Sequence, residues 1–190
     1  MDDCLNWLDH VTGLSVKLGR IQYLFKRLTK FLTKEVLRDV YFAYVESIIR
    51  YGIVLWGSSS HAVTIFRMQK RFLRLMNGKS LTHTCRGLFR SSNVLTLTGI
   101  YVLELSLLAR KMAPTWETGA KVHGYATRHN SEIRLDYHRT SAFESSPLYR
   151  AKMTYNKLPP ELRAVVSLHV FKHKLKAWLC EKEFYSLNEF

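Results

Sequence analysis

Apolar residues recur along most of this 190-residue chain at steps of three and four positions. Such spacing places side chains on one face of a helix with 3.6 residues per turn. It predicts helices over residues 9–32, 34–51, 62–77, 99–112 and 146–158, and a last helix that starts at Ser167. We therefore expect a mainly α fold, a helical bundle with short extended segments and a smaller helical C-terminal part.

Residues 34–57 form the most apolar and aromatic segment of the chain. Gly52 is expected to end its helix, because glycine readily takes the left-handed conformation found just past a helix. The apolar run 53–56 has the length and composition of a buried, strand-like segment. The core face predicted for the helix consists of Val36, Leu37, Val40, Tyr41, Tyr44 and Ile48.

The helices predicted on either side of this segment each have one basic face. About 100° of rotation per residue places four cations of each helix on the face opposite its apolar stripe. No acidic residue interrupts either set, which favours contact with phosphate groups over an ordinary solvated face. The candidate nucleic-acid-binding residues are Arg20, Lys26, Arg27 and Lys30 on the first helix and Arg67, Lys70, Arg71 and Arg74 on the second.

The overall charge agrees with this local pattern. Lys and Arg number 29 against 15 Asp and Glu, which gives a net charge of +14. A polyanionic partner is expected, with nucleic acid ahead of a membrane, and an inert basic surface is the alternative. No membrane span is predicted, because the apolar runs 48–56 and 100–109 are short and contain Arg50 and Glu104.

The stretch 113–141 has the least regular pattern. It places Arg128, Arg134 and Arg139 among tyrosines and histidines, a composition that favours contact with a nucleic-acid backbone. We add Arg128 and Arg139 to the candidate binding residues. The three histidines are six and nine residues apart, and this spacing matches no compact metal site. They are His123, His129 and His138.

The last predicted helix has a buried stripe that includes Trp178, which we interpret as a core residue and not as a base-stacking residue. Lys172 and Lys174 on its flanks complete the candidate nucleic-acid-binding set.

Catalytic or metal-binding groups are not predicted anywhere in the chain. Asp2 and Asp3 lack the further ligands that a metal centre needs, so a solvated turn is the simpler interpretation. Cys4, Cys85 and Cys180 are too far apart for a zinc ligand pair. Their odd number and the lack of a signal peptide favour free thiols in a reducing compartment, nuclear or cytoplasmic, in a protein that is not secreted.

Several short motifs, taken in order, resemble the C-terminal end of the reverse transcriptase of jockey-like non-LTR retrotransposons. The resemblance covers nearly the whole chain, and its motifs are specific together and weak singly. They are Leu5-x-Trp7-x-x-His10-Val11, the run EVLRDVYFAYVESIIRYGIVLWGSS, Gln69-Lys70-Arg71-Phe72-Leu73-Arg74 with Asn77-Gly78, Cys85-Arg86-Gly87-Leu88-Phe89 with Leu95-Thr96-Leu97, Thr127-Arg128, His138-Arg139-Thr140-Ser141, Tyr155-Asn156-Lys157-Leu158-Pro159, and FKHKLKAWLCEKEFYS.

This resemblance implies a domain organisation. Residues 1–10 would follow the polymerase palm, 11–112 would form a thumb-like helical domain, 113–141 an irregular basic and aromatic region, and 142–190 a helical C-terminal extension. Gly99 departs from the family, whose members tend to have proline there.

The resemblance also implies a function. A thumb holds the template-primer duplex, RNA or DNA, by its backbone and packs on the palm and fingers of the polymerase. The palm signature Tyr-x-Asp-Asp is missing from this chain. We therefore expect no polymerase activity from the chain alone, no small-molecule substrate, and no cofactor, since magnesium would bind only with the palm.

Two other hypotheses remain. The chain could be a structural or protein-interaction module that packs on a palm domain. It could also be a host-adopted helical DNA-binding protein of the helix-turn-helix type, although the long apolar segment between the two basic helices does not resemble the short turn of that motif.

Overall fold

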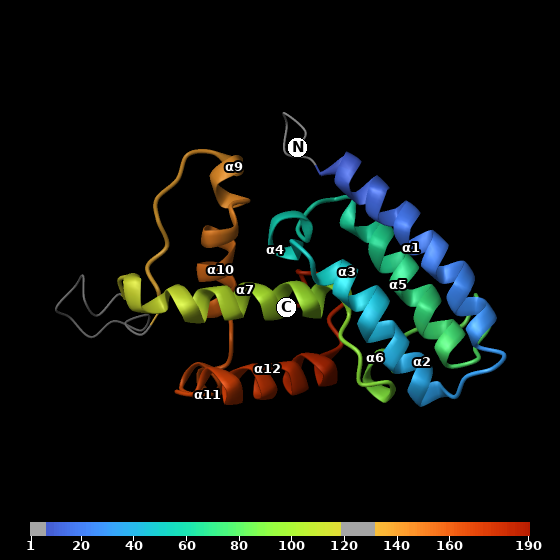
Figure 1. Cartoon of the computed structure of the whole chain (residues 1–190). Helices are drawn as coiled ribbons and strands as arrows, with labels where there is room; N and C mark the ends of the chain where they lie inside the picture. The colour runs from blue at the N-terminus through green and yellow to red at the C-terminus, as the bar shows by residue number, and fades with distance from the viewer. Residues whose placement is uncertain (1–6, 119–131) are drawn as a thin grey trace. The chain divides into compact units, whose positions relative to one another are not determined.

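The computed structural model describes residues 7–118 and 132–190. These residues are mainly helical, as the hydrophobic pattern predicts (Figure 1). The extended pairing found in them is a single antiparallel bridge between Thr118 and Ile133. The mainly α fold class is therefore confirmed.

The helices follow one another through the described part of the chain, and for each of the six predicted helices an observed helix begins within two residues of the predicted start. They are α1 (Leu8–Leu28), α2 (Lys34–Val40), the π-helix η1 (Tyr41–Glu46), α3 (Ser47–Arg50), α4 (Ile53–Trp56), α5 (Ala62–Met76), α6 (Leu88–Ser91), α7 (Leu97–Met112), the 3-10 helix η2 (Ala113–Thr115), α9 (Ser141–Glu144), α10 (Pro147–Asn156), α11 (Pro160–Arg163) and α12 (Leu168–Lys182).

The chain divides into two compact units. The first comprises residues 1–101 and 179–189, and the second comprises residues 102–178 together with Phe190. The C-terminal segment thus belongs to the same unit as the N-terminal helices. The division at residues 112 and 141 that the resemblance implies stays a prediction.

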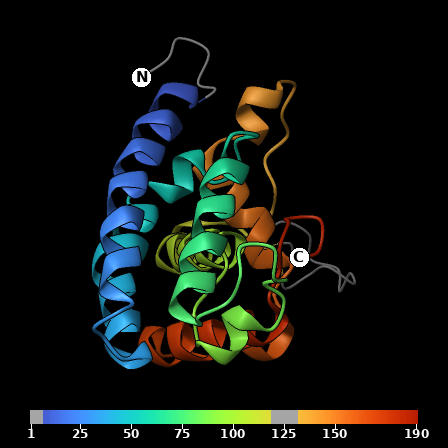
Figure 2. The same ribbon diagram turned by 90° about the vertical axis from the view of Figure 1, so that its right-hand side faces the viewer.

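Helices α1 and α5 lie side by side in the first unit (Figures 1 and 2). Their apolar stripes meet, and the rings of Phe25 on α1 and Phe72 on α5 pack edge to face with centroids 5.3 Å apart. Both rings are buried. α1 is unbroken through Gly13 and Gly19, so this packing outweighs the low helix propensity of the two glycines.

The segment from Lys34 to Arg50 is helical throughout, but a π-helical stretch lies in its middle. A π-helix has a wider turn than an α-helix, so residues at repeated four-residue steps stay on one face. The buried apolar residues are accordingly Leu37, Tyr41, Val45 and Ile49. The core face predicted with a 3.6-residue period is therefore partly wrong, since Val36 and Tyr44 are exposed by 44% and 61%.

The strand-like conformation predicted for residues 53–56 is also wrong. Gly52 has the positive φ of 61° expected of a residue that ends a helix, but the chain then forms the short helix α4. Trp56 is buried there, and its Nε1 donates a hydrogen bond to the Tyr51 carbonyl oxygen over 3.1 Å. The segment is apolar because it is buried, and its length alone does not distinguish a helical turn from a strand.

The C-terminal segment stabilises the irregular stretch between α5 and α7. The Glu183 carboxylate accepts hydrogen bonds from the backbone N–H groups of Gly87 and Arg90, over 2.7 and 2.6 Å, at the start of α6. Thr96 donates from its hydroxyl to the Phe184 carbonyl oxygen over 2.7 Å. Residues nearly a hundred positions apart are thereby joined within the first unit.

The second unit is organised around Arg110 of α7. Its guanidinium donates to the Tyr155 hydroxyl over 2.8 Å and to the backbone carbonyl oxygens of residues 163, 165 and 166. It also lies 5.6 Å from the ring centroid of Phe171, which is fully buried on α12. Arg110 is thus a structural cation and does not belong to a binding surface.

Candidate nucleic-acid interface

The basic face of α5 borders a groove in the first unit. The cations of this helix lie within about 100° of arc at 100° per residue, while its opposite side is buried. The groove has a volume of about 450 Å³. Its walls are Gln22 of α1, the cations Arg67, Lys70, Arg71 and Arg74 of α5, and Leu81.

A second hollow of about 370 Å³ adjoins the first, because Gln22 and Arg71 border both. Its other walls are Gly19, Tyr23 and Lys26 from α1 and Met68 from α5. We call the two hollows together the α1–α5 groove. The part bordered by Arg67, Lys70 and Arg74 is its cationic half, and the part bordered by Gly19, Tyr23 and Met68 is its apolar half.

Two of the groove cations are held by neighbouring groups. The Lys70 ammonium lies 4.6 Å from the ring centroid of Phe66 and 5.7 Å from that of Tyr185. The Nε of Arg74 donates to the His83 carbonyl oxygen over 2.7 Å. Rings and a carbonyl oxygen orient these cations without cancelling their charge, which leaves the charge available to an anion.

No carboxylate of the described residues borders the groove. In the part of the chain that the structure describes, none of its five cations forms an ion pair with an acidic residue. Like charges gathered in a hollow focus a positive potential and concentrate anions there. The groove can therefore bind a polyanion.

The structure brings together five of the candidate binding residues. They are Lys26, Arg67, Lys70, Arg71 and Arg74, all at the α1–α5 groove. Arg20 and Arg27 on α1 are exposed but do not border the groove, and the same holds for Lys30 in the turn that follows α1. Arg139, Lys172 and Lys174 are exposed in the second unit, and Arg128 lies outside the described residues.

Several lining residues were not predicted. Gln22 and Tyr23 stand four and three positions before Lys26, so helical spacing could have placed them on the same flank of α1. Leu81 follows α5 in an irregular stretch, and no periodicity could have assigned it to the groove.

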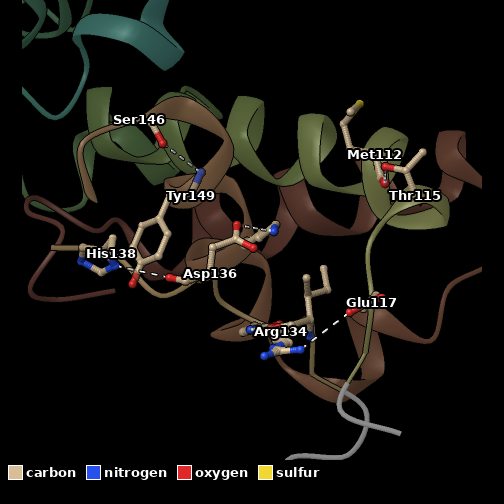
Figure 3. A network of polar contacts seen from close by, with 11 residues as sticks. Met112, Thr115, Glu117, Arg134, Asp136, His138, Ser146 and Tyr149 are labelled. Atoms are coloured by element: carbon tan, nitrogen blue, oxygen red, sulfur yellow. Dashed lines mark hydrogen bonds and ion pairs between the residues drawn. The ribbon is translucent and has the colours of Figure 1, made fainter. Parts of the chain in front are cut away.

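Two cations of the second unit, Lys152 and Arg134, form ion pairs with carboxylates (Figure 3). Lys152 Nζ lies 2.6 Å from the Asp136 carboxylate, and the guanidinium of Arg134 lies 3.8 Å from the carboxylate of Glu117. The predicted basic and aromatic surface at 113–141 is thus partly neutralised in its described residues.

The histidines of this region do not form a metal site in the described residues, where no cluster of three potential ligand side chains occurs. The His138 ring packs against the rings of Phe143 and Tyr149, with centroids 5.8 and 4.6 Å away. His123 and His129 lie outside the described residues.

The cysteines that the structure describes are buried free thiols. Burial raises the pKa of the Cys85 thiol, and its Sγ donates to the Lys70 carbonyl oxygen over 3.6 Å. A raised pKa disfavours the nucleophilic thiolate, so Cys85 is a packing residue. Cys4, like Asp2 and Asp3, lies outside the described residues.

Among the described helices, none has the length and apolar character that crossing a bilayer requires.

Comparison with known proteins gives the chain no relative: no family model matches it, and neither does a characterised protein or a solved structure.

Proposed function

We propose that this chain binds nucleic acid by its sugar-phosphate backbone, as the thumb-like part of a jockey-like non-LTR retrotransposon reverse transcriptase. The observation that carries the proposal is the α1–α5 groove, where five cations from two helices meet and where residues 7–118 and 132–190 contribute no carboxylate. A thumb must hold a template-primer whatever its sequence, so it needs phosphate contacts and no base-specific side chains.

The residues that carry the resemblance support the same role. In the motif Gln69-Lys70-Arg71-Phe72-Leu73-Arg74, the three cations border the groove while Gln69, Phe72 and Leu73 are fully buried. One short motif therefore supplies three buried residues of the first unit and three of the five groove cations.

The polymerase reaction itself would need the palm and fingers as partners. A palm supplies the carboxylates that hold magnesium, and the groove residues that the structure describes include no carboxylate. We accordingly assign this chain a binding role and no catalytic step.

Salt dependence of binding tests the proposal. Each phosphate contact with a duplex contributes about −0.9 to the slope of log K against log salt concentration, so contacts by all five groove cations give a slope of about −4.5. The measurement is a fluorescence-anisotropy titration of an RNA/DNA hybrid at several salt concentrations, repeated with an unrelated sequence. A slope near zero, or a strong preference for one sequence, would contradict the proposal.

A second function is favoured by the apolar residues on the solvent side of the first unit. Val16, Leu24 and Phe31 are exposed by 52%, 58% and 82%. Exposed apolar side chains are available for protein-protein contacts, as expected of a module that packs on a palm domain. A chain that self-associates and binds no hybrid would support this alternative, whereas a monomer that binds hybrid would support the first proposal.

A further inference from the structure

The α1–α5 groove changes character along its length. Arg67, Lys70 and Arg74 border one half, whereas the other half is bordered by a glycine, a tyrosine and a methionine. Arg71 borders both halves, and Lys26 adds a second cation at the apolar half. A site for phosphates alone would not need the apolar half.

Gly19 borders the apolar half without a side chain of its own. A Cβ atom at this position would have its nearest neighbour, the Met68 Cε, at 4.0 Å, which is ordinary van der Waals contact. Space for a larger group therefore exists beside Met68. Tyr23, one turn further along α1, borders this space and is exposed by 64%, so its ring is accessible to a ligand.

A nucleotide combines the two kinds of group that the halves suit. Its base is a flat ring that stacks on aromatic and apolar side chains, and its phosphates are anions that need cations. In a duplex both faces of a base are covered by its neighbours, so only an unpaired nucleotide offers a free face. Each half also has the size of a small-molecule site, commonly about 300–1,000 Å³.

We infer that the α1–α5 groove binds single-stranded nucleic acid, with an unpaired base in the apolar half against Tyr23 and Met68 and the flanking phosphates on Lys26, Arg71 and the cationic half. This inference rests on the proposed function and goes beyond it, since a thumb that grips a duplex backbone needs no base contact. The ligand is a single strand, or the unpaired end of a template, and not only a duplex.

Three ligands of about ten nucleotides test the inference on the full chain by anisotropy titration. They are a single-stranded DNA, the same strand with abasic sugars in place of its nucleotides, and the duplex. Stacking of one base predicts that the intact strand binds about 5- to 150-fold more tightly than the abasic strand. Equal affinity of the two strands would overturn the inference.

Two variants locate the contact. Gly19→Leu fills the apolar half with a good helix former, and Tyr23→Ala removes the ring. Each should lower the affinity for the intact strand to that for the abasic strand and change the affinity for the duplex by less than about two-fold. Tyr44→Ala is the matched control, because Tyr44 is similarly exposed and does not border the groove.

The outcomes distinguish this inference from the proposed function of backbone binding. If all three ligands bind with a steep salt dependence and neither variant has an effect, the base site is wrong and backbone binding stands. If no ligand binds with a measurable salt slope, the base site and backbone binding by the groove are both wrong.

Discussion

The side-chain amide of Gln69 joins helix α5 to Tyr41, since its Nε2 donates to the Tyr41 hydroxyl over 2.8 Å. The same nitrogen donates to the Leu95 carbonyl oxygen over 2.9 Å, and Gln69 is fully buried. Lys70 and Arg71 follow Gln69 directly in the chain. The buried amide therefore fixes the rotation of α5 that places its cations at the α1–α5 groove.

Loss of this amide should destabilise the first unit. Gln69→Leu leaves the Tyr41 hydroxyl and the Leu95 carbonyl without their buried partner, so we expect the free energy of unfolding to fall by about 2–3 kcal/mol. Tyr41→Phe removes one of the two hydrogen bonds and should cost about 1 kcal/mol. Urea denaturation measures both, and equal losses in the two variants would show that the Leu95 hydrogen bond contributes nothing.

The groove cations should differ from the other cations of α1 in binding. Arg71→Gln should weaken binding of an RNA/DNA hybrid about eight-fold at about 0.1 M salt and reduce the log-log salt slope by about 0.9, because one phosphate contact is lost. Arg20→Gln is the control, since Arg20 is exposed on α1 but does not border the groove. Equal effects of the two variants would mean that diffuse surface charge, and not the groove, binds the hybrid.

The side-chain carboxylate of Glu183, in the C-terminal segment, should stabilise the start of α6. In Glu183→Gln only the amide oxygen can still accept a hydrogen bond, so the Gly87 or Arg90 N–H loses its acceptor, at a cost of about 1–2 kcal/mol. Hydrogen exchange should therefore accelerate at these two amides. Glu181→Gln is the matched control, because Glu181 is an exposed residue at the end of α12. Unchanged exchange in Glu183→Gln would refute this capping role.

Sequence pattern predicts the helices of the first unit well where one period holds throughout. α1 and α5 keep an α-helical repeat, and their buried and basic faces follow from it. The segment containing η1 does not keep this repeat, because a π-helical turn shifts the period and moves Tyr44 out of the core. A period of 3.6 cannot reveal that shift, which depends on how the helix packs.

The charged part of the groove could also be predicted, whereas its shape could not. Clustering of like charge identified Arg71 and Lys26 from their helix faces alone. That α1 and α5 lie side by side, and that Gly19 leaves a space next to Met68, are consequences of tertiary packing. The contact of Glu183 with residues 87–90 is equally invisible to local pattern, because it joins distant parts of the chain.

The ion pair of Lys152 and Asp136 should stabilise the second unit. The Lys152 side chain is only 11% exposed, and its ammonium also lies 5.2 Å from the Trp116 ring centroid. Asp136→Asn leaves this ammonium without a negative partner. Because Asp136 is itself half exposed, we expect a loss of about 1–2 kcal/mol in the free energy of unfolding.

The exposed pair of Arg134 and Glu117 provides the comparison for this measurement. Its charged atoms are 3.8 Å apart and both side chains are more than half exposed, so Glu117→Gln should change stability by less than about 0.5 kcal/mol. A loss in Glu117→Gln as large as that in Asp136→Asn would argue against burial of Lys152 as the cause.

The stability of the chain should fall at alkaline pH because of Tyr41. Burial raises the pKa of the Tyr41 hydroxyl far above its usual range, and the nearby charge of Glu46 adds to the shift. Below about pH 10 the folded and unfolded states both keep this proton, and its contribution to stability is complete. Above that pH only the unfolded state ionises, so the free energy of unfolding falls by up to about 1.4 kcal/mol per pH unit.

Tyr41→Phe isolates this effect in urea denaturation between about pH 9 and pH 11.5. The variant starts less stable, because it lacks the hydroxyl that accepts from Gln69, but its stability should decline less steeply above pH 10. Phe25→Leu serves as control, since it weakens the packing of α1 on α5 by about 1–2 kcal/mol and keeps Tyr41. Its curve should be offset from that of the unmodified chain at every pH without a change in slope. Parallel curves for Tyr41→Phe and the unmodified chain would mean that Tyr41 ionises without unfolding, and that the contact with Gln69 does not keep it from solvent.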